Sequence, residues 1–108
     1  KYPGGMDMGG RIDVSQNSGH GLIEGRIMHC RWFALVQPEP TSFGINPRTL
    51  LKGGGRVSRL CVYTGSTNNK EIVAEYSRGW VSLKYNYIDI VEELVNYLER
   101  RYSLRVVK

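Results

Sequence analysis

The sequence predicts an α+β fold in which an antiparallel sheet of about four to five strands carries a long C-terminal helix on one face. Apolar and polar residues alternate over residues 22–36, 56–64 and 70–80, which is typical of half-buried strands. Residues 87–102 instead repeat apolar side chains every three to four positions, the spacing of one helical face. Because the strands come first and the helix last, we expect the helix to cover one sheet face and leave the other open.

The 108 residues are enough for one hydrophobic core, and a content of 41% hydrophobic and 23% charged residues is ordinary for a globular domain. Residues 1–10 contain four glycines and a proline without periodicity. We therefore expect a flexible Gly-rich arm over residues 1–10 and a single α+β domain over residues 11–108. This domain opens with a short strand at 11–15 and a turn at 16–21.

The longest strand-like segment, residues 22–36, is predicted to be one continuous strand in which Gly25 marks a bulge or bend. Strict alternation divides it into two faces. The predicted core face consists of Ile23, Ile27, His29, Phe33 and Leu35. The opposite face consists of Glu24, Arg26, Met28, Cys30, Trp32 and Ala34.

A loop with a short helix is predicted between this strand and the central hairpin. Pro38 and Pro40 end the strand. Asn46 followed by Pro47 has the form of a helix N-cap with proline in the first turn, and Gly53 supplies a stop. The pattern predicts a short helix over residues 47–52.

The central hairpin is predicted from residues 56–64 and 70–80, which are separated by the turn-rich residues 65–69. Alternation in the first strand places Val57 on the same face as Arg59, Cys61 and Tyr63. In the second strand one face consists of Ile72, Ala74, Tyr76, Arg78 and Trp80.

The C-terminal helix is predicted from its cap and from its periodicity. Asn86 is the expected N-cap with Asp89 at the third helical position, and the helix is expected to end near Tyr102. A final edge strand or an irregular tail would then occupy residues 104–107. The predicted core-facing residues are Tyr87, Val91, Leu94, Val95, Leu98 and Tyr102.

The positive charge of the chain is concentrated in its centre. Residues 41–84 contain seven lysines and arginines against two glutamates, a surplus of five that equals the net charge of +5 of the whole chain. Aromatic residues lie among these basic residues on the predicted strands. Arginine beside an aromatic ring on a sheet is how such surfaces neutralise phosphates and stack bases.

The familiar catalytic and cofactor motifs do not fit this sequence. The glycines at 53–55 precede a strand, whereas a phosphate-binding loop opens a helix and ends in Lys-Ser/Thr. His29 and Cys30 are adjacent on a strand and so point to opposite faces, which argues against a zinc site. His29 with Cys61 is the one conceivable nucleophilic pair, and a His in such a position is more often a core residue. We expect no catalytic residues, no metal, no cofactor and no enzymatic activity, and we expect both cysteines to be free thiols.

The leading hypothesis is a small nucleic-acid-binding module that prefers single-stranded DNA or RNA to duplex DNA. The expected phosphate contacts and stacking residues are Arg26, Arg31, Trp32, Arg56, Arg59, Tyr63, Tyr76, Arg78, Trp80 and Lys84.

The alternative is a protein-interaction or assembly subunit, a homodimer among the options, that uses the same surface, since Trp, Tyr and Arg are also enriched at interface hot spots. The sequence has no apolar run near the ~20 residues that span a bilayer, so we expect no membrane partner and a soluble, cytoplasmic protein.

Overall fold

A computed structural model describes residues 12–65 and 68–107, with side chains up to residue 100. Its strands are β1 (Ile12–Asn17), β2 (Leu22–Ile27), β3 (Cys30–Thr41), β4 (Gly55–Thr64), β5 (Glu71–Ser77) and β6 (Trp80–Leu83). A 3₁₀ turn, η1 (Tyr85–Tyr87), leads into the helix α2 (Ile88–Val107). The arm predicted for residues 1–10 lies outside the described residues.

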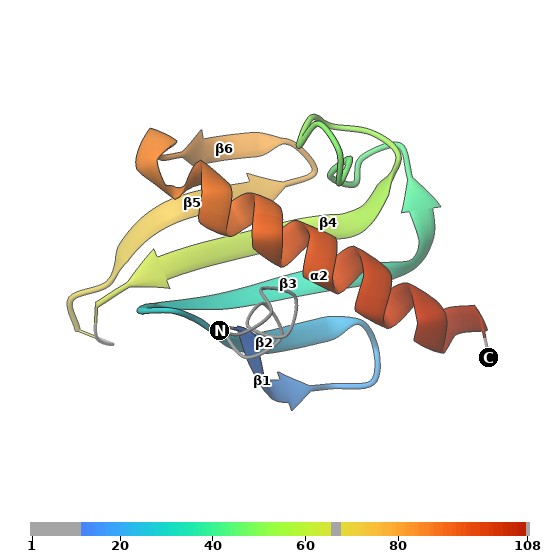
Figure 1. Cartoon of the computed structure of the whole chain (residues 1–108), viewed down its shortest axis with the longest axis horizontal. Coiled ribbons are helices and arrows are strands. Elements are labelled where there is room, and N and C mark those ends of the chain that lie inside the picture. Colours follow the sequence, from blue (N-terminus) through green and yellow to red (C-terminus); the bar gives the residue numbers. More distant parts are fainter. Residues whose placement is uncertain (1–11, 66–67, 108) are drawn as a thin grey trace, which may run out of the picture.

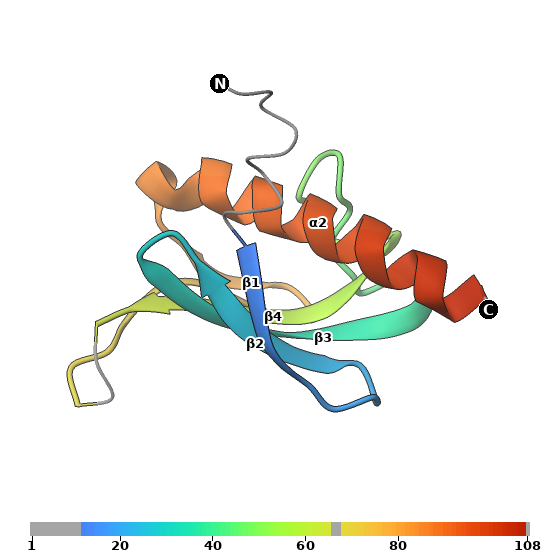
Figure 2. The same cartoon turned by 60° about the horizontal axis from the view of Figure 1, so that its bottom comes forward.

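The six strands form one sheet in which each strand pairs antiparallel with the next along the chain. Helix α2 runs diagonally across one face of this sheet and packs on β3 and β4 (Figure 1). Seen from the side, all of α2 lies on one side of the strands, and no described element covers the opposite face (Figure 2). We call that opposite side the open face.

The predicted fold class is wrong, because the described part of the chain is mostly sheet, with six strands and one C-terminal helix. The short helix expected over residues 47–52 does not form. Asn46 Oδ1 does accept hydrogen bonds from the backbone N–H groups of Arg48 and Thr49, as an N-cap would. However, Leu50 has a φ of 64°, and this left-handed conformation stops the helix after a single turn.

The second correction concerns residues 22–36, which are two strands joined by a tight turn at Met28 and His29. Ile27 pairs directly with Cys30 across this hairpin, and Met28 adopts a φ of 55°. Residues that pair across two strands point to the same face, so the turn changes which residues of the segment are buried. After the turn, the buried residues are those that continuous alternation placed opposite the predicted core face. The buried residues of β3 are Cys30, Trp32, Ala34 and Val36.

Irregular pairing also changes the faces of the central strands. The β3–β4 register shifts between Leu35 and Val36, so Val57 is buried while Arg59, two residues later, is exposed. The segment 70–80 is likewise two strands, because Arg78, with a φ of 61°, and Gly79 turn the chain from β5 into β6. Such bulges and turns leave no mark on a simple alternation count.

Helix α2 contributes a buried apolar stripe of Val91, Leu94, Val95 and Leu98 to the core. Its start differs from the predicted cap. Lys84 precedes η1 in an extended conformation without a side-chain capping bond, and Asp89 lies in the first turn of α2. The helix continues to Val107, so residues 104–107 do not form an edge strand.

The loop between β3 and β4 packs on the helix side of the sheet. The Asn96 side-chain amide in α2 donates to the Pro47 carbonyl at 3.0 Å, and the backbone N–H of Ile45 donates to the Val57 carbonyl at 2.9 Å. Helix and loop therefore share one face of the sheet.

Gly55, where β4 begins, is expected to tolerate no side chain. A Cβ atom at this position would overlap the carbonyl group of Ile45, and a backbone group cannot move aside as a flexible side chain can. We expect Gly55→Ala to lower the free energy of unfolding by about 1–3 kcal/mol, as overpacking does. Gly79→Ala is the control, because a Cβ there has no neighbour within 4 Å. Equal stability of the two variants in urea denaturation would refute this packing.

Candidate functional site

Three of the four aromatic residues expected to stack bases are used inside the protein. Trp32 and Tyr76 are buried on the helix side of the sheet, and the Tyr76 hydroxyl donates to the Phe43 carbonyl at 2.8 Å. Trp80 is half-buried, packs edge-on against Tyr76 at 5.0 Å, and donates from Nε1 to the Leu50 carbonyl at 2.7 Å. Burial of Trp32 and Tyr76 leaves no ring face for a base. The Trp80 indole fastens the β3–β4 loop.

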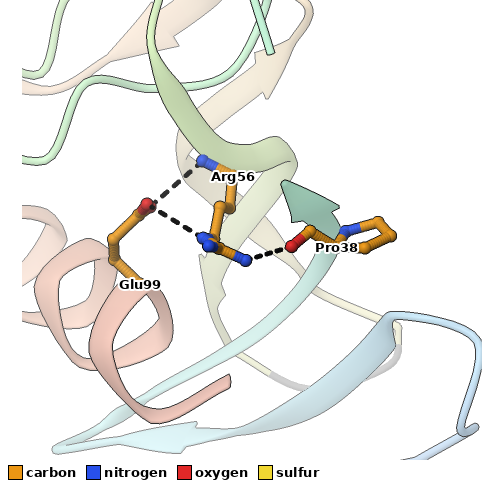
Figure 3. Close-up of polar contacts among 3 residues, drawn as sticks. All are labelled: Pro38, Arg56 and Glu99. Atoms are coloured by element: carbon orange, nitrogen blue, oxygen red, sulfur yellow. Dashed lines mark hydrogen bonds and ion pairs between the residues drawn. The ribbon is translucent and has the colours of Figure 1, made fainter. Parts of the chain in front are cut away.

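Arg56 joins three elements rather than facing a ligand (Figure 3). Its backbone N–H donates to Glu99 Oε1 at 3.1 Å, and its Nε lies 3.7 Å from Glu99 Oε2. Its Nη1 also donates to the Pro38 carbonyl. Both side chains of the ion pair are 16% exposed, so water screens the pair only partly. This arrangement ties α2 to β3 and β4, and it removes Arg56 from the set of phosphate contacts.

Two further predicted phosphate contacts lie near the β6 edge of the sheet. The Arg78 guanidinium carbon is 4.4 Å from the centroid of the Phe43 ring, a cation–π contact with the β3–β4 loop. Lys84 Nζ lies 3.7 Å from Glu71 Oε2, with both side chains exposed. The Arg78 side chain therefore contacts the loop on the helix side of the sheet. The charge of Lys84 is paired with the carboxylate of Glu71.

The remaining predicted residues, Arg26, Arg31, Arg59 and Tyr63, share the open face. Arg26 on β2 pairs with Arg31 on β3, and Arg31 pairs with Tyr63 on β4. Lys70 Nζ lies 4.5 Å from the centroid of the Tyr63 ring. We call the line of Asp13, Arg26, Arg31 and Tyr63 on β1 to β4 the basic row. Like charges directly opposite each other destabilise a sheet, and Arg31 lies between Arg26 and Tyr63, so Arg31 gains from an acidic or aromatic partner.

A second line of side chains crosses the open face next to the basic row. Glu24 on β2 pairs with Phe33 on β3, Phe33 with Cys61 on β4, and Cys61 with Glu75 on β5. We call this line the acidic row. Phe33 is half-buried although it faces away from the helix, and Glu24 is exposed. A third line follows in which Leu22 pairs with Leu35, and Leu35 with Arg59.

The open face carries charges of both signs around an apolar band. Its strands contribute three arginines and three carboxylates, and Lys70 adds one positive charge over the Tyr63 ring. The six strand residues are Arg26, Arg31, Arg59, Asp13, Glu24 and Glu75. Among the described side chains no ion pair joins these six groups. The apolar band crosses the face from Leu22, 44% exposed, to Ile72, 40% exposed, through Leu35, Phe33, Cys61 and Tyr63.

Sequence reasoning missed Phe33, Leu35, Glu24 and Glu75 as members of this surface. Phe33 and Leu35 were assigned to the core because the turn at Met28 and His29 was not recognised. The one signal in the sequence is the length of the segment 22–36, since fifteen residues exceed the usual strand length. The carboxylates could be placed only after the register was known.

Both cysteines are free thiols. Burial raises the pKa of the Cys30 thiol. Burial and then the nearby Glu75 carboxylate raise the pKa of the Cys61 thiol, so it stays protonated at neutral pH. His29 Nε2 lies 3.2 Å from the Tyr87 hydroxyl, on the helix side, whereas Cys61 faces the open side. The conceivable nucleophilic pair is therefore separated by the sheet.

A metal-binding cluster of three or more His, Cys, Asp or Glu side chains is not found in the described part of the chain. Burial also raises the pKa of Tyr76, which keeps its hydroxyl neutral and able to donate to Phe43. Within residues 12–65 and 68–107, α2 is not apolar enough to cross a membrane.

Fold and surface together define a six-stranded antiparallel meander with one face covered by a helix and the other exposing a mixed charged and apolar surface. The chain belongs to a family described as Domain of unknown function (DUF7678), whose model matches residues 17–99. This range contains the basic row from Arg26 to Tyr63, the acidic row and the buried stripe of α2. No curated protein and no solved structure matches the chain.

Proposed function

We propose that this protein is an interaction module of the cytoplasm that binds another protein through its open sheet face. The observation that supports this is the composition of the face, where an apolar band with one aromatic on each of β3 and β4 is bordered by charges of both signs without ionic partners among the described residues. Interfaces combine such an apolar centre with a polar rim. Arg and Tyr are residues that often anchor them.

The position of three aromatic residues on the helix side, away from the open face, favours protein over nucleic acid as the partner. A base-stacking surface needs exposed ring faces, and Trp32, Tyr76 and Trp80 are committed to the helix side. A phosphate-binding surface also needs a large surplus of positive charge. On the described open face Asp13, Glu24 and Glu75 offset the three arginines, which leaves only the charge of Lys70.

Site-specific photo-crosslinking in the cells that make the protein tests this proposal. A photoreactive amino acid at Glu24, exposed on the open face, should yield a discrete protein–protein adduct. The same amino acid at Glu92, exposed on the outer side of α2, is the matched control and should yield none. Equal adducts from both positions, or none from Glu24, would contradict the proposal.

Nucleic-acid binding remains a second candidate, which the basic row favours. Arg26 and Arg31 are directly opposed, Tyr63 follows in the same line, and Lys70 lies over the Tyr63 ring. Two phosphates and one stacked base could be accommodated there in a single-stranded chain.

A salt titration tests this second candidate. If the basic row binds single-stranded oligonucleotides, replacing Arg26 and Arg31 with Gln should make the slope of log K against log salt shallower by ~0.7 per lost phosphate contact. Arg48→Gln, at an exposed position on the β3–β4 loop, serves as the control. An unchanged slope, or no measurable binding by the wild type, would eliminate this candidate.

A further inference from the structure

The open face has the properties of a surface that matches itself. In a two-fold symmetric dimer the same patch is used by both copies, so the patch must contain the groups that its own groups require. A patch for an oppositely charged partner would carry mainly one sign of charge. The open face instead carries both signs, and Arg26 and Glu24 follow each other on the same face of β2, in neighbouring lines of the sheet.

We propose that the partner of the open face is a second copy of this chain, bound face to face about a two-fold axis. This inference rests on the proposed function and identifies its partner. The axis lies between the two sheets and runs across the strands. Rotation about it keeps the order of the strands but reverses the direction along each strand, so the basic row of one copy lies over the acidic row of the other.

The register predicts which side chains meet. With the axis between the two rows, Arg26 lies over Glu24 of the other copy, and the reciprocal pair forms by symmetry. Arg31 lies over Phe33 of the other copy, where a guanidinium can stack on the ring. Glu24 of each copy thus supplies a counter-charge to Arg26 of its partner. Within one chain Asp13 lies opposite Arg26 on the neighbouring strand, but no ion pair joins these two described residues.

The size of the face agrees with this arrangement. The protein measures 36 × 36 × 27 Å, and the view down the shortest axis looks onto the sheet, so the broad side is parallel to the strands (Figure 1). Stable interfaces bury roughly 800 Å² per partner, and the sheet face is large enough for this. Antiparallel sheets commonly pack face to face in this way about 10 Å apart.

Sedimentation of charge-reversed variants tests the proposal. The wild type, free of nucleic acid by its absorbance, should sediment as a dimer. Arg26→Glu puts a carboxylate over Glu24 of the other copy, and Glu24→Arg puts a guanidinium over Arg26 of the other copy. Each variant should associate at least about tenfold more weakly than the wild type, because like charges then face each other across the interface.

Mixing the Arg26→Glu and Glu24→Arg variants should restore the dimer, because residues 24 and 26 then face each other with opposite charges at both symmetry-related contacts. The control is an equal mixture in which the reversed residues lie off the open face, Arg48→Glu with Arg100→Glu in one chain and Asp89→Arg with Glu92→Arg in the other. That mixture should sediment like the wild type. Circular dichroism checks that every variant is folded.

A monomeric wild type at every concentration would overturn the second-copy inference, and so would a mixture of the two face variants that stays monomeric while both are folded. If the wild type is monomeric but the crosslinker at Glu24 captures a different protein, the open face is an interface for that protein and only the identity of the partner was wrong. If the wild type is monomeric and Glu24 captures no protein, both proposals fail.

Discussion

Replacing Trp32 with Ala is expected to lower the free energy of unfolding by about 3–5 kcal/mol, the usual loss for a large aromatic side chain removed from a core. Trp32 lies in the middle of β3, pairs with Gly25 and Val62 on the neighbouring strands, and is 1% exposed. A Cβ atom at Gly25 would lie 2.8 Å from Cζ2 of the Trp32 ring, so this ring packs closely against the Gly25 backbone. Gly25 has no side chain that could fill the cavity left by alanine. Urea denaturation measures the loss.

Phe33→Ala is the matched control, because Phe33 follows Trp32 on the same strand but points to the open face, where it is half-buried. It should cost clearly less stability in the monomer than Trp32→Ala and should instead weaken any association through the open face. If the two losses of stability were reversed, β3 would have the register predicted from the sequence and the open face would be misassigned.

Replacing Leu98 with Ala is expected to cost about 2–5 kcal/mol, the range for a buried leucine. Leu98 is fully buried between α2 and the sheet, one residue before the Glu99 that holds Arg56. Thermal or urea unfolding gives the loss directly.

Arg100→Ala, on the exposed side of the same helical turn, is the control and should change stability by less than about 0.5 kcal/mol. A Leu98→Ala protein that is as stable as Arg100→Ala would mean that α2 turns another side toward the sheet.

The sequence predicts correctly those parts of the fold in which apolar residues recur at regular short spacing. Val91, Leu94, Val95 and Leu98 follow helical spacing, and all four are buried. The strand count was not accessible, because a hairpin turn at Met28 and His29 contains neither Gly, Pro nor Asn, and its left-handed residue is a methionine. The helix expected after Asn46 shows the same limit: the local capping chemistry is present, but the chain turns away at Leu50.

The sequence predicts the candidate site only in part, because the strand register decides which side chains share a face. Arg31 and Tyr63 were singled out by type, and the pairing of β3 with β4 brings them together. Trp32 and Phe33 exchanged faces because one unrecognised turn changes the phase of every later residue on the strand. Arg56 was drawn to Glu99, which is 43 residues away in the sequence, and no spacing argument reaches such a pair.

The most direct test of the central claim uses Cys61 as a reporter in the middle of the open face. Cys61 is 8% exposed there, while Cys30 is fully buried on the other side of the sheet and should not react. We predict that alkylation of Cys61 by iodoacetamide at one fixed alkaline pH, where part of the thiol is ionised, slows as the protein concentration rises and is unaffected by added single-stranded RNA. An alkylation rate that is the same at all protein concentrations would contradict a face covered by a second copy. A rate that is slowed only by RNA would mean that the open face binds nucleic acid instead.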